Sequence, residues 1–226
     1  MAMIRYKPNK VNLFDWTSPM AYAVGLITTD GCLYSDFRHV SFISKDLEQI
    51  TNLRSILGIY PKIGQNFNVY GSTYRVQFSN VQLFDWLISI GLCPNKSLSI
   101  GVITIPNEYF RDFLRGHLDG DGSITTYRQT YTKKNLDTNI YNRLTLRFIS
   151  ASQTHMKWLQ SKIIDIFHVT GRLHISKANK IGNSMYILKY GKIDALELLS
   201  KIYYSDEILC LKRKRNIYEQ FLKYTK

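Results

Sequence analysis

An internal duplication constrains the fold of this 226-residue chain more than any other sequence feature. A nine-residue pattern ending in Asp-Gly occurs twice, as AVGLITTDG at 23–31 and as LRGHLDGDG at 114–122. Each copy is followed by the string Phe-Ile-Ser, at 42–44 and again at 148–150, and then by apolar residues at helical spacing. Because the order of these segments is repeated, the sequence predicts two related halves.

The two halves are unequal in length. Asp30 and Asp121 are 91 residues apart, whereas Ser44 and Ser150 are 106 apart, so the second half carries 15 extra residues between these landmarks. The polar, basic stretch at 127–141 accounts for them, and it predicts a longer hairpin or loop. We expect one half over residues 1–104 and the other over 105–226.

Each motif is expected to lie on a helix. Ser18 before Pro19 is typical of a helix start, with serine as the N-cap and proline at the first helical position. Pro106 offers a similar start before the second motif. Gly25 and Gly116, each five residues before the motif aspartate, would let the two helix backbones approach closely.

Between the helices, apolar and polar residues alternate as they do in strands with one buried face. The segments with this pattern are 38–43, 73–78, 142–148, 172–177 and 185–190. Antiparallel sheets with helices on one face and a polar, basic opposite face make an α+β fold.

Composition limits the class of partner. The chain has 30 Lys and Arg against 17 Asp and Glu, a net charge of +13, and 45% hydrophobic residues. This charge favours a polyanion, most simply nucleic acid, and the apolar content argues against disorder. No apolar run could cross a membrane, and the three cysteines have no paired spacing. We therefore expect an intracellular protein that is not secreted and has no membrane partner.

The paired aspartates suggest a metal site. A carboxylate at a helix C-terminus opposes the helix dipole, and a bound cation would reverse that effect. Packing through Gly25 and Gly116 would bring Asp30 and Asp121 to one rim, where oxygen ligands favour Mg²⁺ and phosphodiester hydrolysis. The alternative is that both Asp-Gly pairs are ordinary turns that end two helices.

With these motifs, the chain resembles the LAGLIDADG homing endonucleases of the single-chain, double-motif type. Gly-Leu-Cys-Pro-Asn-Lys-Ser at 91–97 and the closing helix from about Leu209 add to the resemblance. It implies two pseudo-symmetric αββαββα halves, motif helices at their interface, and sheets that form a saddle over double-stranded DNA. It further implies a monomer that makes site-specific double-strand cuts at a long asymmetric target.

The resemblance also implies the site residues. Asp30 and Asp121 would be metal ligands, helped by the backbone carbonyls of Thr29 and Gly120. They would hold two or three divalent ions, Mg²⁺ in the reaction, with Mn²⁺ or Ca²⁺ able to substitute in binding. Basic residues around the acids would organise water and stabilise charge, and the candidates are Lys96, Lys214 and Lys45, with Lys212 as a competitor for the role of Lys214.

Three departures from the family pattern are visible. The first copy has Thr28 at the position of the first aspartate of the motif, which is not a metal ligand in the family. Arg115 is expected to face solvent or the protein's own acids, and His117 to be a packed, hydrogen-bonded histidine rather than a base.

Polar strand residues are the candidates for DNA contact, because an antiparallel ribbon fits the major groove. On the alternating strands they are Arg75, Gln77, Arg143, Arg147, Arg172, His174 and Lys189. The extra segment of the second half adds Arg128, Lys133 and Lys134.

Two other functions remain open. One is an RNA-binding intron maturase, a splicing cofactor, with or without DNA cleavage. The other is a DNA-binding regulator without nuclease activity, although loss of one aspartate would be expected there. The abundance of Ile, Asn, Lys and Tyr suggests an AT-rich coding genome, as in organelles or phages. We therefore expect the protein in a mitochondrion or chloroplast, or in the cytoplasm of a bacterial or phage-infected host.

Overall fold

The computed structural model describes residues 14–69, 71–132, 138–176 and 184–225. The first half contains α1 (Ser18–Asp30), β1 (Gly31–Leu33), β2 (His39–Ser44), α2 (Leu47–Leu57), β3 (Gly64–Asn68), β4 (Gly71–Ser79), α3 (Val81–Ser89) and α4 (Lys96–Ser99). The second contains a 3-10 turn (Asn107–Tyr109), α5 (Phe110–Asp119), β5 (Ser123–Thr132), β6 (Thr138–Ser150), α6 (Gln153–Phe167), β7 (Arg172–Ile175), β8 (Tyr186–Tyr190), α7 (Lys192–Ile202) and α8 (Lys212–Thr225).

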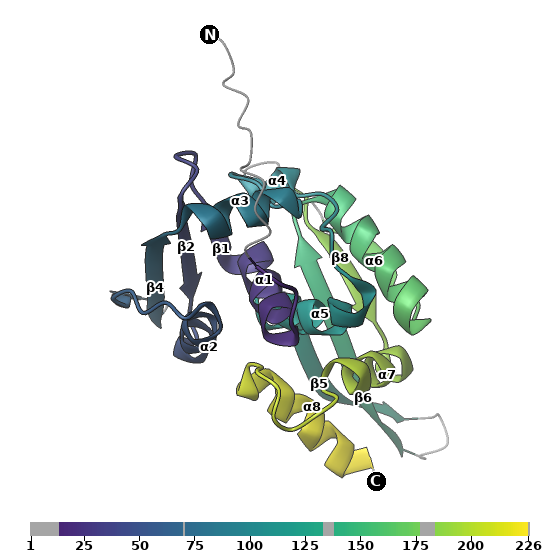
Figure 1. Cartoon of the computed structure of the whole chain (residues 1–226). Coiled ribbons are helices and arrows are strands. Elements are labelled where there is room, and N and C mark those ends of the chain that lie inside the picture. The colour runs from purple at the N-terminus through teal and green to yellow at the C-terminus, as the bar shows by residue number, and fades with distance from the viewer. Residues whose placement is uncertain (1–13, 70, 133–137, 177–183, 226) are drawn as a thin grey trace.

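Both halves follow the same order of elements, αββαββα with a closing helix (Figure 1). The sheets repeat the same strand order as well, β1-β2-β4-β3 and β5-β6-β8-β7, with every neighbouring pair antiparallel. The predicted α+β fold with two pseudo-symmetric halves is confirmed. The boundary expected at 104/105 lies in the segment that joins α4 to the 3-10 turn.

The extra residues of the second half lengthen one hairpin. The pairing of β5 with β6 runs from Ser123 opposite Arg147 to Thr132 opposite Thr138, whereas β1 and β2 pair over three residues. The predicted longer hairpin is therefore confirmed, and it extends away from the centre of the molecule in Figure 1.

The motif helices α1 and α5 lie side by side at the centre of the molecule (Figure 1). A Cβ atom on Gly25 would lie 2.2 Å from the carbonyl oxygen of Phe113, and one on Gly116 would lie 2.1 Å from that of Tyr22. Only glycine fits at such a distance, so the predicted close approach of the two backbones is confirmed.

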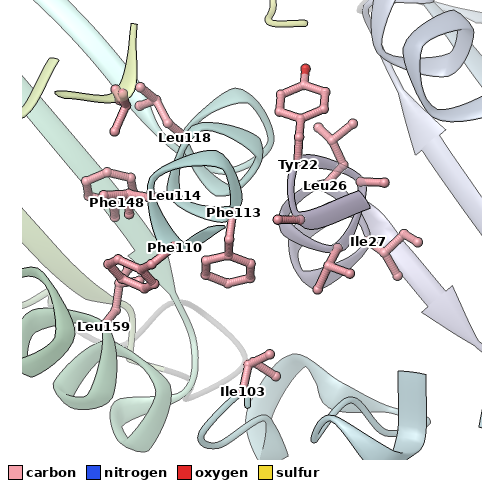
Figure 2. Close-up of a cluster of buried hydrophobic side chains, with 14 of the residues drawn as sticks. Tyr22, Leu26, Ile27, Ile103, Phe110, Phe113, Leu114, Leu118, Phe148 and Leu159 are labelled. Carbon is pink, nitrogen blue, oxygen red and sulfur yellow. The ribbon is translucent and has the colours of Figure 1, made fainter. Parts of the chain in front are cut away.

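Large apolar side chains surround this crossing. Figure 2 shows Tyr22 and Leu26 on α1 beside Phe113 on α5, with Phe113 pointing toward Ile103. All four are buried, and the buried Tyr22 hydroxyl has a polar partner that is described below. Burial of each large side chain contributes roughly 1.5 to 3 kcal/mol to the free energy of folding, and this stabilises the packing of the two helices.

The helix starts differ slightly from the prediction. The N-cap of α1 is Thr17 and not Ser18: the Thr17 hydroxyl accepts a hydrogen bond from the Met20 amide at 3.2 Å. Proline still lies in the first turn. Before α5, the residues after Pro106 form a 3-10 turn, and the α-helix begins only at Phe110.

Arg115 and His117 on α5 are both buried, as are Asp112 and Asp119. Arg115 is 2% exposed, forms an ion pair with Asp112 at 2.7 Å, and donates to the carbonyl oxygens of Ile202 and Leu209. The prediction that it meets the protein's own acid is right, and the solvent alternative is wrong. His117 lies 3.1 Å from His155, nitrogen to nitrogen, so it is a packed, hydrogen-bonded histidine as predicted. Within the described ranges, no helix combines the length and apolar character needed to cross a bilayer.

Candidate active site

The two motif aspartates lie at the same end of the α1–α5 pair. Asp30 is the last residue of α1, and Asp121 follows α5 after Gly120. The peptides before them are in contact across the interface, because a Cβ atom on Gly120 would lie 1.9 Å from Thr29 Oγ1 and 2.9 Å from Asp30 Oδ2. The duplicated motif thus brings two carboxylates from different halves to one place.

These carboxylates are partly removed from water and repel each other. Burial raises the pKa of Asp30 to about 7, and the negative charge of Asp121 adds to the increase. Burial also raises the pKa of Asp121. The positive charges of Lys96 and Lys214 act against both increases. A further cation between the acids would favour their ionised forms.

Two buried lysines hold the backbone next to the acids. Lys96 Nζ donates to the Thr29 carbonyl oxygen at 3.1 Å, and Lys214 Nζ donates to the Gly120 carbonyl oxygen at the same distance. Lys214 also donates to the carbonyl oxygens of Leu118, Asp119 and Gly122, each at 2.7 Å. Burial lowers the pKa of both lysines, that of Lys214 to about 8.

The structure distinguishes Lys214 from its neighbour. Lys212 is exposed at the start of α8, where its backbone amide donates to Glu48 Oε2 at 3.0 Å. The lysine beside the motif is therefore Lys214. Lys45 lies farther out, exposed at the rim of a pocket that contains Asp30.

Each aspartate lines its own open pocket. The Asp30 pocket has a volume of about 340 Å³ and is lined by Asp30, Ile43, Ser44, Lys45, Asp46, Gln49, Thr73, Asp119, Gly120 and Arg213. The Asp121 pocket, about 280 Å³, is lined by Thr28, Thr29, Lys96, Ser97, Ile100, Asp121, Ile149, Ser150, Ala151 and Met185. Each pocket combines an aspartate and a Phe-Ile-Ser strand end from one half with the residue before the aspartate of the other half.

The donor atoms of this site suit a hard divalent cation. They are the two carboxylates and the carbonyl oxygens of Thr29 and Gly120. A carbonyl oxygen has two lone pairs, so the bond from lysine leaves one for a metal. In the described part of the chain, no group of three or more His, Cys, Asp or Glu side chains could hold a metal. Mg²⁺ fits such a set, because it keeps several waters and needs few protein ligands.

The outer faces of the sheets carry the predicted basic residues. Across the second sheet, Arg147 on β6 is directly opposite Lys189 on β8, which is opposite Arg172 on β7. Like charges in adjacent register positions repel, so this row of three cations is unfavourable unless a polyanion covers it. His174, opposite Ile187, is on the same face one row further on.

The first sheet has a smaller basic surface. Arg75 donates to the Tyr34 hydroxyl at 2.6 Å and to Gln77 Oε1 at 2.8 Å. These hydrogen bonds hold the side chains of Arg75 and Gln77 next to each other. In the second sheet, Arg143 donates to Gln129 at 3.0 Å.

The structure separates Arg128 from this set. Arg128 is opposite Asn142, so strand alternation places it on the same face as Leu144 and Leu146, with α8 nearby. It projects to the opposite side of the hairpin from Arg143. Lys133 and Lys134 lie outside the described residues.

Sequence reasoning missed three residues of the site. Asp119 is fully buried and accepts hydrogen bonds from the Tyr22 hydroxyl at 2.9 Å and the Leu211 amide at 2.7 Å. Gln49 donates to the Asp119 carbonyl, and Arg213 lines the Asp30 pocket. Asp119 could have been found, since it precedes Asp121 by two residues where the first copy has Thr28.

Comparison with protein-family models and with curated proteins gives no match to this chain. Solved structures do match. The meganuclease I-SmaMI, bound to uncleavable DNA, has a TM-score of 0.60 and 16% identity, over 92% of this chain and 90% of that one. I-DmoI in complex with DNA and Ca has a TM-score of 0.56 and 15% identity, over 89% of this chain and 97% of that one.

A third similar structure is full-length DUF199/WhiA from Thermotoga maritima, with a TM-score of 0.57 and 16% identity, over 95% of this chain and 63% of that one. The chain thus has the fold of the LAGLIDADG homing endonucleases, in a single chain with two motif-bearing halves. At this level of identity the likeness shows the fold, and the activity must be argued from the site.

Proposed function

We propose that this chain is a metal-dependent endonuclease that cuts both strands of DNA at a long, asymmetric site. One observation carries the proposal: Asp30 and Asp121, from different halves, line adjoining pockets, and a buried lysine bonds the carbonyl oxygen before each of them. Two pockets related by pseudo-symmetry suit the two strands of a duplex.

The chain's own groups would hold and balance charge. Asp30 and Asp121, with the carbonyl oxygens of Thr29 and Gly120, would hold divalent cations, for which we propose Mg²⁺. Such cations, when bound, lower the pKa of bound water and stabilise charge on the phosphate being cleaved. Lys96 and Lys214 would fix the peptides that carry the aspartates and offset negative charge that develops on the phosphate.

The outer sheet faces would bind the duplex. The row of Arg147, Lys189 and Arg172 can neutralise phosphates or contact bases, and Arg75 with Gln77 offers a different set of donors on the other sheet. Because the halves differ here and in hairpin length, they would read different half-sites. The I-SmaMI structure, which shares this fold, is described as bound to DNA.

The decisive experiment is selection of cleaved sites from a randomised duplex library with Mg²⁺. We expect one long asymmetric sequence to be cut in both strands. Asp30→Asn and Asp121→Asn should each abolish double-strand cutting and retain binding to that sequence. Full double-strand cutting by the purified Asp30→Asn, Asp121→Asn double variant would refute the proposal.

The second candidate is a DNA-binding protein without nuclease activity. It is favoured by the hydrogen bonds that the Thr29 and Gly120 carbonyls already receive from lysines, which stabilise the site without a metal. If it is correct, selection by binding will yield a specific sequence, and no cut will appear with Mg²⁺ or Mn²⁺. A structured intron RNA in the same binding assay tests the maturase alternative.

A further inference from the structure

We propose that the two pockets bind their scissile phosphates unequally, and that the strand held in the Asp30 pocket is cut first. The inference rests on the proposed function. It depends on Lys45 and Arg213, which line the Asp30 pocket and have no basic counterpart in the Asp121 pocket.

The duplication identifies the counterparts. Ser44 and Ser150 occupy equivalent places, so the residue that corresponds to Lys45 is Ala151, and each lines the pocket of its own half. Lys96 and Lys214 are equivalent in the same way, since each bonds the carbonyl before the aspartate of its half. The residue that precedes Lys214 is Arg213, and the one that precedes Lys96 is Asn95. At both positions the residue that lines the Asp30 pocket is a cation, whereas its counterpart is neutral: Ala151 lines the Asp121 pocket, and Asn95 does not line it.

An ion pair fixes the orientation of Arg213. Its Nε and Nη2 donate to the two carboxylate oxygens of Asp46, at 2.8 and 2.7 Å. Asp46 is the N-cap residue of α2 in the first half, whereas Arg213 is on α8 of the second, so the pair joins the two halves. This bidentate contact orients the guanidinium, and Nη1 takes no part in the ion pair. Of the Arg213 side chain, 57% is exposed.

Asp46 and Asp119 also line the Asp30 pocket, so the pockets differ in the basic side chains available as donors and not in an excess of positive charge. Lys45 and Arg213 both line the Asp30 pocket, and both are exposed. An ammonium and an oriented guanidinium can both donate to the non-bridging oxygens of one phosphate.

The Asp121 pocket offers less. Of its described lining residues, Ile100, Ile149, Ala151 and Met185 are apolar, and Lys96 is the basic one. Lys96 is buried and already donates to the Thr29 carbonyl oxygen. Its other polar lining residues, Thr28, Thr29, Ser97 and Ser150, are neutral, so a phosphate there would receive fewer charge-assisted bonds and would be held less firmly in a reactive position.

The chemistry is the same in both strands. The oxygen of a water molecule forms a bond to phosphorus and loses a proton, one phosphorus–oxygen ester bond breaks, and the departing oxygen gains a proton. A phosphate monoester and a hydroxyl result, and no oxidant or reductant is needed. The pockets would therefore differ in rate and not in products.

The first test follows both strands of the selected target, each with its own end label, after rapid mixing with Mg²⁺. We expect a nicked intermediate that is cut in one strand only. Lys45→Ala and Arg213→Gln should slow the cut of that same strand about tenfold or more and leave the other strand within about twofold. Equal rates for both strands in the wild type, or equal slowing of both strands in these variants, would overturn the inference.

Two controls separate phosphate binding from a structural role of Arg213. Asp46→Asn weakens the ion pair but retains the guanidinium of Arg213. The first strand should therefore be cut faster by Asp46→Asn than by Arg213→Gln. Lys212→Ala removes an exposed charge next to Arg213 that does not line the pocket, and it should leave both strands unchanged. If Asp46→Asn slows the first strand as much as Arg213→Gln, the role is structural and the inference fails.

A second readout needs no metal and no cleavage. Two duplexes each carry one neutral methylphosphonate, placed at one scissile phosphate or at the other. Without divalent ions, we expect the wild type to lose about tenfold in affinity for the first-cut position and little for the second. The Lys45→Ala, Arg213→Gln double variant should lose this difference. Equal losses at both positions in the wild type would contradict the inference, whereas failure to find any cleaved target would contradict the proposed function instead.

Discussion

Lys214 Nζ donates a hydrogen bond to the carbonyl oxygen of Gly120, the residue before Asp121, at 3.1 Å. Lys96 bears the same relation to Thr29, the residue before Asp30. The two bonds differ in their surroundings, because Lys214 also serves three further carbonyls of the motif segment and Lys96 is paired with one.

This difference predicts unequal effects on stability. Lys214→Met leaves several buried carbonyl oxygens unpaired, so we expect it to lower the free energy of unfolding by roughly 2 to 4 kcal/mol. Lys96→Met should cost about 1 kcal/mol, and both should reduce cleavage. Urea unfolding with parallel cleavage assays measures this, and an equal loss of stability in the two variants would contradict it.

The glycines of the helix crossing predict a steric effect. A Cβ atom on Gly25 would lie 2.2 Å from the Phe113 carbonyl oxygen, in the backbone of α5, which cannot move without separating the helices. Gly25→Ala should therefore lower the free energy of unfolding by about 3 kcal/mol or more. Gly101→Ala is the control, because a Cβ there would meet its nearest neighbour at 4.0 Å. Comparable melting temperatures for the two variants would refute the steric argument.

The sequence predicted the fold where local patterns carry the information. Alternation identified β2, β4, β6, β7 and β8 but not β1, β3 or β5, and the repeated motif identified the helix pair and the two aspartates. The sequence could not predict that Arg115 is buried. The carbonyl oxygens that accept its hydrogen bonds belong to Ile202 and Leu209, which lie 87 and 94 residues further along the chain. Likewise, the face on which Arg128 projects depends on its register with Asn142, which strand alternation alone does not fix.

The same limit applied to the site. Lys212 and Lys214 are indistinguishable as members of a charge run, and only the docking of α8 against β5 and the segment that ends α5 buries one of them. Arg213 belongs to the same run, and its partner Asp46 lies in the other half. Contacts between halves are absent from any local pattern, and the ion pair of Arg213 with Asp46 is such a contact.

The paired carboxylates predict a pH dependence of stability in the metal-free protein. The pKa of Asp30 is raised to about 7, so the folded state keeps a proton that the unfolded state loses near pH 4. This contribution makes the free energy of unfolding fall as pH rises from about 4 to 7. Asp30→Asn should remove this fall in the free energy of unfolding between about pH 4 and 7. Asp165→Asn, at an exposed helix position, should retain it.

The same carboxylates predict a response to metal. Addition of millimolar Mg²⁺ should raise the melting temperature of the wild type at pH 8, above the raised pKa of Asp30, and much less at pH 5, where Asp30 holds a proton. Asp30→Asn should lose most of the increase. An equal increase at both pH values, measured by thermal unfolding, would place the binding elsewhere.

The buried histidine pair predicts the opposite trend in acid. Burial lowers the pKa of His155 to about 4, and it also lowers the pKa of His117 well below its usual value. The unfolded state therefore binds protons below about pH 6.5 that the folded state refuses, so stability falls as pH drops from 6.5 to 4. His155→Gln copies Gln49, which is its equivalent in the first half, and should reduce this loss. Urea unfolding at pH 7 and pH 5 compares the variants, and identical pH slopes would contradict the assignment.

The row of cations on the second sheet predicts opposite effects on stability and on DNA binding. Arg147, Lys189 and Arg172 are in adjacent register positions, so removal of the central charge relieves repulsion in the free protein. Lys189→Gln should leave the free protein equally stable or more stable, by up to about 0.5 kcal/mol. If Lys189 contacts a phosphate, the slope of log affinity against log salt should decrease by about 1. Lys157→Gln, at an exposed position on α6, is the matched control and should change neither quantity. A binding titration at several salt concentrations, with urea unfolding of the same samples, measures both effects, and an unchanged slope for Lys189→Gln would exclude this row from the DNA interface.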